Sequence, residues 1–282
     1  MRALHTSDWH VGKRLGRYDR MEDFRATISE VVDVAQRQDV DLVLPSGDLF
    51  ARPLPPVEAL DVAFSGLVDL SDRGRRPVVV IAGNHDSPGL FEALAPFFVE
   101  HNVHLVGAIR HPDRGGVLAV DTKRGPALVA CFPFLREGRV VDFLADAGRW
   151  YGQYADRVRR IAEEYAAALV AKADSQTVCF LVGHFLVGGV RLGGHGTPRG
   201  ERELHMGNAY AATPQAIPSS LSYVALGHVH APQPVPGAQV PALYAGSLLE
   251  LDFGEAGEQK RVVVVEADPG LPLETRRGHA RS

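Results

Sequence analysis

The chain has 282 residues, of which 45% are hydrophobic and 23% are charged, and its formal net charge at pH 7 is -4. This balance fits a globular protein with a sizeable core and excludes general disorder. No apolar stretch approaches the roughly 20 residues that cross a bilayer, and no signal-peptide pattern opens the chain. We therefore expect a cytoplasmic protein without membrane contact. Because the net charge is slightly negative, any nucleic-acid contact has to come from local basic clusters.

In the first third of the chain, apolar runs alternate with amphipathic segments. The apolar runs contain the β-branched and large residues that buried strands favour, and they lie at 3–5, 42–44 and 78–81. Helical segments are expected at 22–36, 56–70 and 90–98. This alternation of strand and helix predicts a largely parallel sheet.

Short apolar runs separated by turn residues follow, and we expect them to begin a second sheet; they lie at 103–106, 117–120 and 127–132. A long helix is expected at 153–172, where apolar residues recur at helical spacing. The glycine-rich stretch 188–213 predicts a loop without regular structure, and loops of this length are often functional. Later strands are expected at 178–182, 223–226, 242–245 and 262–266.

Five of the apolar runs end in side chains that can bind metal ions. The motifs are Asp8-Trp9-His10, Gly47-Asp48, Gly83-Asn84-His85-Asp86, Gly183-His184 and Gly227-His228-Val229-His230. Strands of one sheet bring distant positions together at one edge, so we expect the motifs to meet. An extended backbone would point Asp8 and His10 to one face and Trp9 to the other, and the same spacing relates His228 to His230.

Singly, each motif is weak evidence, because a lone histidine on a strand is more often a packed or surface residue than a ligand. Together they offer imidazoles, carboxylates and an amide, a set that suits Mn²⁺, Fe or Zn²⁺ and exceeds the needs of one ion. Two ions about 3.5–4 Å apart suit in-line displacement at phosphorus, because both the attacking and the leaving oxygen need charge stabilisation. The residues predict a two-metal phosphoesterase site and leave the ester open.

The ordered motifs resemble those of the calcineurin-like metallophosphoesterase superfamily. The resemblance implies an α/β fold in which two mixed β-sheets pack face to face and are flanked by helices, a four-layer αββα arrangement. It implies that one metal ion is held by Asp8, His10, Asp48 and His230. It implies that the second ion is held by Asp48, Asn84, His184 and His228, so that Asp48 bridges the two.

The resemblance also assigns roles to the two residues after Asn84. His85 would not be a ligand; it would face the scissile phosphate and protonate or stabilise the leaving oxygen. Asp86 would orient or support the same loop, and a turn-stabilising carboxylate is an equal alternative for it. His85 and Asp86 are therefore the candidate catalytic residues.

Flanking residues narrow the resemblance to the SbcD family of bacterial nuclease subunits. The matching segments are 4–12, 83–88, 201–203, 223–233, 244–247 and 252–255, together with Lys260. This resemblance implies a Mn²⁺-dependent DNA nuclease with double-strand 3′→5′ exonuclease and single-strand endonuclease activities. It also implies an SbcC-type ATPase partner, a homodimer, and a role in DNA end processing, repair and recombination.

The expected organisation is a nuclease domain over residues 1–270 and a C-terminal tail over 271–282. Members of the family generally continue into a DNA-capping domain, which we expect this chain to lack. Candidate contacts to DNA phosphates are Lys13, Arg14 and Arg17, which directly follow the first motif, and Arg191 in the glycine-rich stretch.

Two other kinds of function compete with a DNA nuclease. A phosphomonoesterase or a cyclic-nucleotide phosphodiesterase would use the same two-metal core. Protein phosphatases of the superfamily usually continue Gly-Asp with x-x-Asp-Arg-Gly, whereas Ala51 and Pro53 stand here in place of the second Asp and the last Gly. A non-catalytic scaffold is expected to have lost ligands or His85, and all of these are present.

Overall fold

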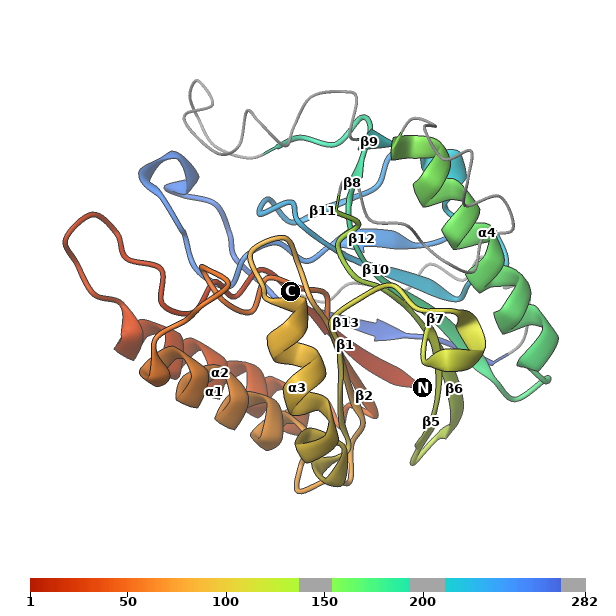
Figure 1. Cartoon of the computed structure of the whole chain (residues 1–282), viewed down its shortest axis with the longest axis horizontal. Helices are drawn as coiled ribbons and strands as arrows, with labels where there is room; N and C mark the ends of the chain where they lie inside the picture. Colours follow the sequence, from red (N-terminus) through yellow and green to blue (C-terminus); the bar gives the residue numbers. More distant parts are fainter. Residues whose placement is uncertain (137–153, 193–210, 270–282) are drawn as a thin grey trace.

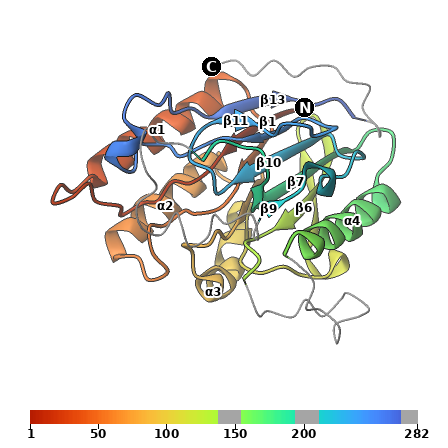
Figure 2. The same ribbon diagram turned by 90° about the horizontal axis from the view of Figure 1, so that it is seen from above.

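The computed structural model of the chain describes residues 1–136, 154–192 and 211–269. Two large β-sheets pack face to face, and helices cover the outer face of each (Figure 1 and Figure 2). The expected four-layer α/β arrangement is therefore confirmed. The matching segment 201–203, the tail 271–282 and residue 153 of the predicted long helix lie outside the described residues.

The first sheet contains the strands predicted for the first third of the chain. In spatial order its strands are β13 (Val263–Glu266), β1 (Arg2–Thr6), β2 (Leu42–Pro45), β3 (Val78–Ile81) and β4 (Val103–Val106). β1 to β4 are parallel, and β13 is antiparallel to β1. Its outer face is covered by α1 (Met21–Arg37), α2 (Val57–Leu70) and α3 (Pro88–Phe98). The predicted order of parallel strands and helices is confirmed.

The second sheet is also mixed. In spatial order its strands are β11 (Gln233–Pro234), β12 (Ala242–Tyr244), β10 (Tyr223–Gly227), β7 (Val178–His184), β6 (Gly125–Phe132) and β5 (Val117–Thr122). The four central strands are parallel, whereas the edge strands β5 and β11 are antiparallel to their neighbours. The predicted long helix, α4 (Tyr154–Lys172), covers the outer face. Short 3₁₀ helices among the described residues are η1 (Val99–His101), η2 (Pro112–Arg114), η5 (Pro214–Ala216) and η6 (Phe253–Glu255).

Two predictions about strands are wrong. β4, expected in the second sheet, pairs with β3 of the first, because the α3 crossover returns the chain beside β3 as a parallel βαβ unit does. The stretch 188–213 is not wholly irregular, since β9 (Ala211–Ala212) pairs with β8 (Leu186–Val187) in a separate small sheet. Ala212 is buried, so its backbone groups need hydrogen-bond partners. The strand pair provides one, because the Gly188 amide donates to the Ala212 carbonyl oxygen at 2.8 Å.

Side chains of the parallel strands alternate between two buried faces. Leu4, Val43 and Val80 pack against the helices α1 to α3, whereas their neighbours Leu44 and Val79 lie in the core between the two sheets. Burial on both faces explains why these strands are nearly continuous apolar runs. The packing of the two inner faces also holds the sheets against each other. Their metal-ligand motifs therefore lie at a common edge.

A small group of polar side chains, centred on His5, lies in this core between the sheets. His5 is fully buried, with Nε2 2.9 Å from Ser46 Oγ and Nδ1 3.0 Å from the Tyr223 hydroxyl. Since Tyr223 belongs to β10, the histidine joins the first sheet to the second. Burial lowers the pKa of His5 to about 3, so the ring is neutral near pH 7.

The buried His5 ring should make the fold less stable in acid. The unfolded chain takes up a proton near the ordinary pKa of 6.5, whereas the folded protein does so only near a pKa of about 3. Between these values the unfolded state binds more protons, so the free energy of unfolding falls by up to about 1.4 kcal/mol per pH unit of acidification. His5→Gln keeps a donor and an acceptor but does not titrate, so its free energy of unfolding should fall less steeply with acidification. Urea unfolding in EDTA at several pH values in this range measures both slopes; parallel slopes would contradict the prediction.

Candidate metal centre

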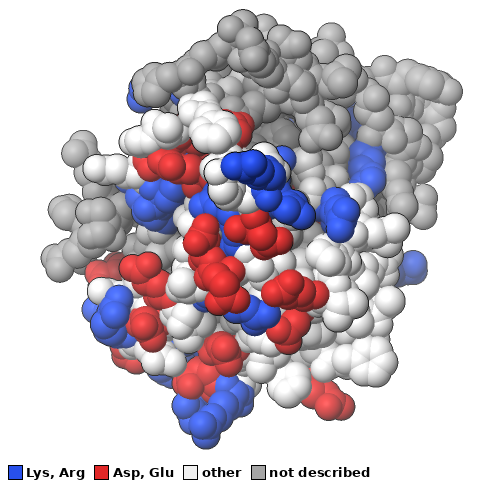
Figure 3. All heavy atoms as spheres, turned by 90° about the vertical axis from the view of Figure 1, so that its left-hand side faces the viewer, with Lys and Arg blue, Asp and Glu red and all other residues white. Residues whose placement is uncertain are grey.

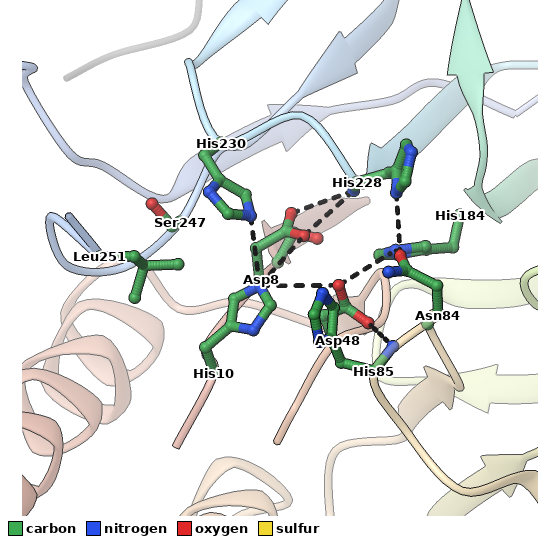
Figure 4. Close-up of polar contacts among 12 residues, drawn as sticks. Asp8, His10, Asp48, Asn84, His85, His184, His228, His230, Ser247 and Leu251 are labelled. Atoms are coloured by element: carbon green, nitrogen blue, oxygen red, sulfur yellow. Dashed lines mark hydrogen bonds and ion pairs between the residues drawn. The ribbon is translucent and has the colours of Figure 1, made fainter. Parts of the chain in front are cut away.

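The metal-ligand motifs meet at one edge of the two sheets (Figure 4). They follow the carboxyl ends of β1, β2, β3 and β10 and include the last residue of β7. Ligands from the first sheet therefore face ligands from the second. The structure brings together every predicted ligand, namely Asp8, His10, Asp48, Asn84, His184, His228 and His230.

The backbone at the ligands is not the extended strand that their spacing suggested. β1 ends at Thr6, and Asp8 and His10 have φ values of 50° and 49°, in the left-handed region. Asp48 and His228 have φ values of 52° and 90°. The prediction that an extended backbone aligns the ligand pairs is therefore wrong, because left-handed turns do so. Such conformations are uncommon outside glycine and persist only where their surroundings hold them.

Hydrogen bonds between the loops hold these turns. The Asp8 amide donates to the Gly47 carbonyl oxygen at 3.0 Å, and the His10 amide donates to the Asp48 carbonyl oxygen at 3.0 Å. The His228 amide donates to the two carboxylate oxygens of Asp8 at 3.1 and 3.2 Å. Loops of both sheets are thus tied together through the ligand residues themselves.

Glycines precede several ligands because the loops approach too closely for a side chain. A Cβ atom on Gly83 would lie 2.1 Å from Asp48 Oδ1. A Cβ atom on Gly47, whose φ is +98°, would lie 2.3 Å from His184 Nδ1. Both contacts are shorter than van der Waals packing allows, so these glycines are required by the packing of the centre.

We expect Gly83→Ala to disrupt the centre. Its methyl group would overlap the Asp48 carboxylate, and overpacking of this kind typically costs about 1–3 kcal/mol of folding free energy. Mn²⁺ binding should be lost as Asp48 is displaced. Gly89→Ala is the matched control, because a Cβ atom there meets only Ser87 Oγ at 3.9 Å. Thermal unfolding and Mn²⁺ titration compare the two variants. Equal stability and equal Mn²⁺ affinity would contradict the predicted overlap with Asp48.

One group of ligands gathers around His10 and His230, whose Nε2 atoms are 3.2 Å apart. His10 Nε2 also lies 4.0 Å from Asp8 Oδ1 and 3.5 Å from Asp48 Oδ2. These four side chains are the set predicted for the first metal ion.

A second group gathers around Asn84. Its Oδ1 atom lies 3.0 Å from His184 Nε2 and 2.9 Å from His228 Nδ1. His184 Nε2 is 3.4 Å from Asp48 Oδ2, the same oxygen that faces His10 in the first group. Asp48 therefore stands between the two groups, where a bridging ligand has to be.

Hydrogen bonds behind two of the histidines leave a lone pair on each for a cation. His230 Nδ1 lies 2.8 Å from Glu255 Oε1, and His184 Nδ1 lies 2.7 Å from the Ser46 carbonyl oxygen. Because both partners are acceptors, Nδ1 carries the proton and Nε2 of the neutral ring is an acceptor. His184 Nε2 faces Asp48 and Asn84, and His230 Nε2 faces His10. A set of imidazoles, carboxylates and an amide oxygen that converges in this way fits two divalent metal ions.

The electrostatics of the protein atoms also favour positive charge in the centre. Burial opposes a charge on His184, but Asp48, together with Asp8 and the Ser46 carbonyl oxygen, outweighs burial and raises the His184 pKa to about 9. Burial likewise opposes the charge on Asp48, yet His184 and His10 hold its pKa well below the ordinary value. Without a metal ion, a protonated His184 thus supplies the positive charge that the buried carboxylate needs. A divalent ion would take the place of the Nε2 proton and supply the charge instead.

His85 lies beside both groups, on the loop after β3. Its backbone amide donates to Asp48 Oδ1 at 2.8 Å, and its ring centroid is 4.9 Å from that of His10. One ring nitrogen lies within 4.8 Å of ligand atoms of His10 and Asp48, so distance alone allows both a ligand and a proton donor. Unlike the buried His10 and His184, the His85 side chain is partly exposed and accessible to a substrate.

Asp86 is buried, and both carboxylate oxygens accept backbone hydrogen bonds. The donors are the amides of Gly83 at 2.8 Å, Phe50 at 3.0 Å and Leu49 at 3.2 Å. Burial and the charge of Asp48 raise the pKa of Asp86 to about 7. These bonds join the loop after β3 to the loop after β2, which is a supporting position; direct participation of Asp86 in catalysis stays a prediction.

Three residues that contribute to the centre were not predicted. Ser46 acts through its carbonyl oxygen, which no side-chain pattern reveals. Glu255 lies in a segment that carried the family resemblance, but its spacing indicated no role. The ring of Phe134 lines the second group, with centroids 6.2 Å from His184 and 5.8 Å from His228, and a single aromatic residue carries no signal in the sequence.

The predicted basic residues lie in two places. Lys13, Arg14 and Arg17 are exposed on the loop between the first motif and α1. The Lys13 amide donates to the His10 carbonyl oxygen at 2.9 Å, so this loop leaves the first ligand group directly. Arg191 is exposed on the separate stretch that follows β8.

A four-layer αββα fold with such a His, Asp and Asn centre at its strand ends defines a metallophosphoesterase. Residues 1–232 match the family described as calcineurin-like phosphoesterase, and the chain belongs to this family.

The SbcD subunits of several bacterial SbcCD nucleases are similar to this chain. It is 34% identical over 280 residues to that of Bacillus subtilis (strain 168), 28% over 279 residues to that of Rhodobacter capsulatus and 29% over 279 residues to that of Escherichia coli (strain K12). These alignments cover 96% of this chain and 67%, 67% and 66% of the relatives, so the chain spans about two thirds of their length. The narrower resemblance to SbcD proteins is confirmed.

A solved dimetal phosphatase from Danio rerio aligns with a TM-score of 0.50 and 10% identity, covering 94% of this chain and 92% of that one. This likeness shows a shared fold. None of the helices that the structure describes combines the length and the apolar character of a membrane span.

Proposed function

We propose that the protein is a metal-dependent DNA nuclease that hydrolyses phosphodiester bonds at a two-metal centre. The observation that carries this proposal is the position of Asp48, whose Oδ2 lies 3.5 Å from His10 Nε2 and 3.4 Å from His184 Nε2. A carboxylate shared in this way would hold two ions close together, as in-line displacement at phosphorus requires. The similarity to nuclease subunits supports DNA as the substrate. We propose Mn²⁺ as the metal, because mixed nitrogen and oxygen ligands suit it.

Bound divalent ions would stabilise the charge on the attacking and leaving oxygens. The protein's own residues would hold and orient the reacting groups. The left-handed loops fix the ligands in advance, so binding costs little rearrangement. His85, partly exposed beside both groups, would hold a proton for the leaving oxygen. Asp86 would keep the His85 loop against the loop of Asp48 through its three backbone hydrogen bonds.

DNA would approach over the loop 11–20, where Lys13, Arg14 and Arg17 are exposed. The neighbouring helices α1 and α2 carry exposed acidic side chains, among them Glu22, Asp23, Glu58 and Asp61. Figure 3 shows basic and acidic side chains mixed on this side of the molecule, with acidic ones gathered near its middle. A polyanion would therefore be attracted to the loop and repelled from the helices.

Neutralising Lys13, Arg14 and Arg17 together as Gln should weaken DNA binding similarly for all sequences. Each phosphate contact contributes about 0.9 to the slope of log K against log salt, so the slope should flatten by up to about 3. Fluorescence anisotropy of duplex DNA in EDTA measures the slope without cleavage. The control is neutralisation of Arg37 and Arg73, which are exposed at the opposite ends of the strands. An unchanged slope would show that these three residues do not contact DNA phosphates.

The proposed function is tested by offering four substrates in parallel with Mn²⁺. They are linear duplex DNA, a closed single-stranded DNA circle, a cyclic nucleotide and p-nitrophenyl phosphate. We expect both DNA substrates to be cleaved, with mononucleotide release from duplex 3′ ends and nicking of the circle. Hydrolysis confined to the small esters would favour a phosphomonoesterase or a cyclic-nucleotide phosphodiesterase, and no hydrolysis would favour a scaffold.

We also propose that an SbcC-type ATPase is the partner in DNA end processing, repair and recombination, that the protein forms a homodimer, and that it works in the cytoplasm. The names of the similar proteins support the partner. Repeating the duplex assay with and without an SbcC-type ATPase tests the partnership, and sedimentation of the chain alone tests the dimer. Unaltered cleavage together with no co-sedimentation would reject the partner.

A further inference from the structure

Glu255 is buried beside the metal centre, and both of its carboxylate oxygens accept hydrogen bonds. Its Oε1 atom lies 2.8 Å from His230 Nδ1. Its Oε2 atom accepts from the Leu251 amide at 3.0 Å, from Lys260 Nζ at 2.8 Å and from Ser247 Oγ at 3.4 Å. Figure 4 shows Ser247 and Leu251 beside His230, on the side away from the second ligand group. Glu255 therefore contacts a ligand without reaching the reacting groups.

The cluster around Glu255 carries a net negative charge. Lys260 Nζ lies 2.8 Å from Glu255 Oε2 and 2.8 Å from Glu258 Oε2, so one cation is shared by two carboxylates. The remaining negative charge lies directly behind His230.

The two ligand groups differ in what supports their histidines. His230 of the first group donates to the carboxylate of Glu255, whereas His184 of the second group donates to the backbone carbonyl oxygen of Ser46. Either acceptor orients the ring, but the stronger hydrogen bond to a carboxylate makes the histidine a more basic ligand than a bond to a carbonyl oxygen does. His230 of the first group therefore has a stronger supporting hydrogen bond than His184 of the second.

We propose that Glu255 is a positioning residue that acts through His230 to give the first metal position the higher affinity for a divalent cation. This inference rests on the proposed metal centre and adds the order in which the two ions bind. The ion held by Asp8, His10, Asp48 and His230 binds first, and the ion held near Asn84 binds second.

Titration of the full chain with Mn²⁺, followed by the electron paramagnetic resonance signal of the free ion, tests the proposal. The wild-type protein should show a tight and a weaker binding event. Glu255→Gln keeps the shape and loses the charge, and should weaken the tight event by about 10- to 100-fold and leave the weaker one unchanged. Glu258→Gln is the matched control, because Glu258 contacts the same Lys260 amine, whereas the carboxylate that accepts from His230 Nδ1 is that of Glu255. It should leave both events close to those of the wild-type protein.

A spectroscopic readout separates positioning from a merely structural role. The His230 Nδ1 proton, bonded to a carboxylate, should give a downfield imidazole signal in the proton spectrum that Glu255→Gln shifts upfield. Glu255→Asp keeps the buried charge and serves if the Gln variant does not fold; its shorter side chain should weaken the tight event less. Equal affinities in the wild type, or a tight event unchanged in both variants, would overturn the proposal. A protein that binds Mn²⁺ in this order but cleaves no DNA would refute the proposed function alone.

Discussion

Replacing His85 by alanine is expected to reduce DNA cleavage by about 10²- to 10⁴-fold, the usual contribution of a general acid or base. The ring is partly exposed beside both ligand groups. The hydrogen bond that His85 donates to Asp48 comes from its backbone amide, so alanine retains it. Metal content and DNA affinity should therefore stay close to those of the wild-type protein. Single-turnover cleavage of duplex DNA, with metal analysis of the same sample, measures both effects.

The matched control for this variant is His101→Ala, because His101 is exposed in η1 after α3 and away from the strand ends that carry the ligands. It should cleave DNA at the wild-type rate. If His85→Ala lost a metal ion along with its activity, His85 would be a ligand, which its position within 4.8 Å of ligand atoms of His10 and Asp48 also permits. If cleavage persisted, His85 would have neither role.

Much of the fold could be predicted because the strands are buried on both faces. All residues of β3 (Val78–Ile81) are valine or isoleucine, and the apolar residues of α1 that face the sheet, among them Phe24, Ile28 and Val31, recur at helical spacing. Such patterns are local, so a single sequence shows them directly. Which sheet β4 (Val103–Val106) joins depends on a crossover through α3, and no local pattern contains that information.

The ligands could be named because metal binding selects side-chain types, and these are visible in the sequence. Their geometry could not be predicted. Asp8 and His10 converge through left-handed turns that are held by bonds to the loop of Asp48, and those bonds exist only after both strands are in the sheet. The support of His230 by Glu255 likewise depends on a segment that returns to the centre from the end of the domain.

Changing Asp48 to asparagine is expected to have the largest effect on the metal centre. Its Oδ2 atom lies near His10 of one group and His184 of the other, and its Oδ1 atom accepts the His85 amide at 2.8 Å. The variant loses a negative charge shared by both positions, so both Mn²⁺ affinities should fall. A loss of several kcal/mol of charge stabilisation corresponds to at least about a 10³-fold drop in cleavage.

Comparison with His184→Asn distinguishes a bridging ligand from an ordinary one. His184 is predicted to hold only the second ion, so its replacement should weaken one Mn²⁺ binding event and spare the other, whereas Asp48→Asn should weaken both. Asp33→Asn, at an exposed position on α1, controls for the change of charge and should bind two ions. Thermal unfolding in EDTA checks that each variant is folded. If Asp48→Asn weakened only one event, the two ligand groups would not share this carboxylate, and the two-metal centre would need a different bridge.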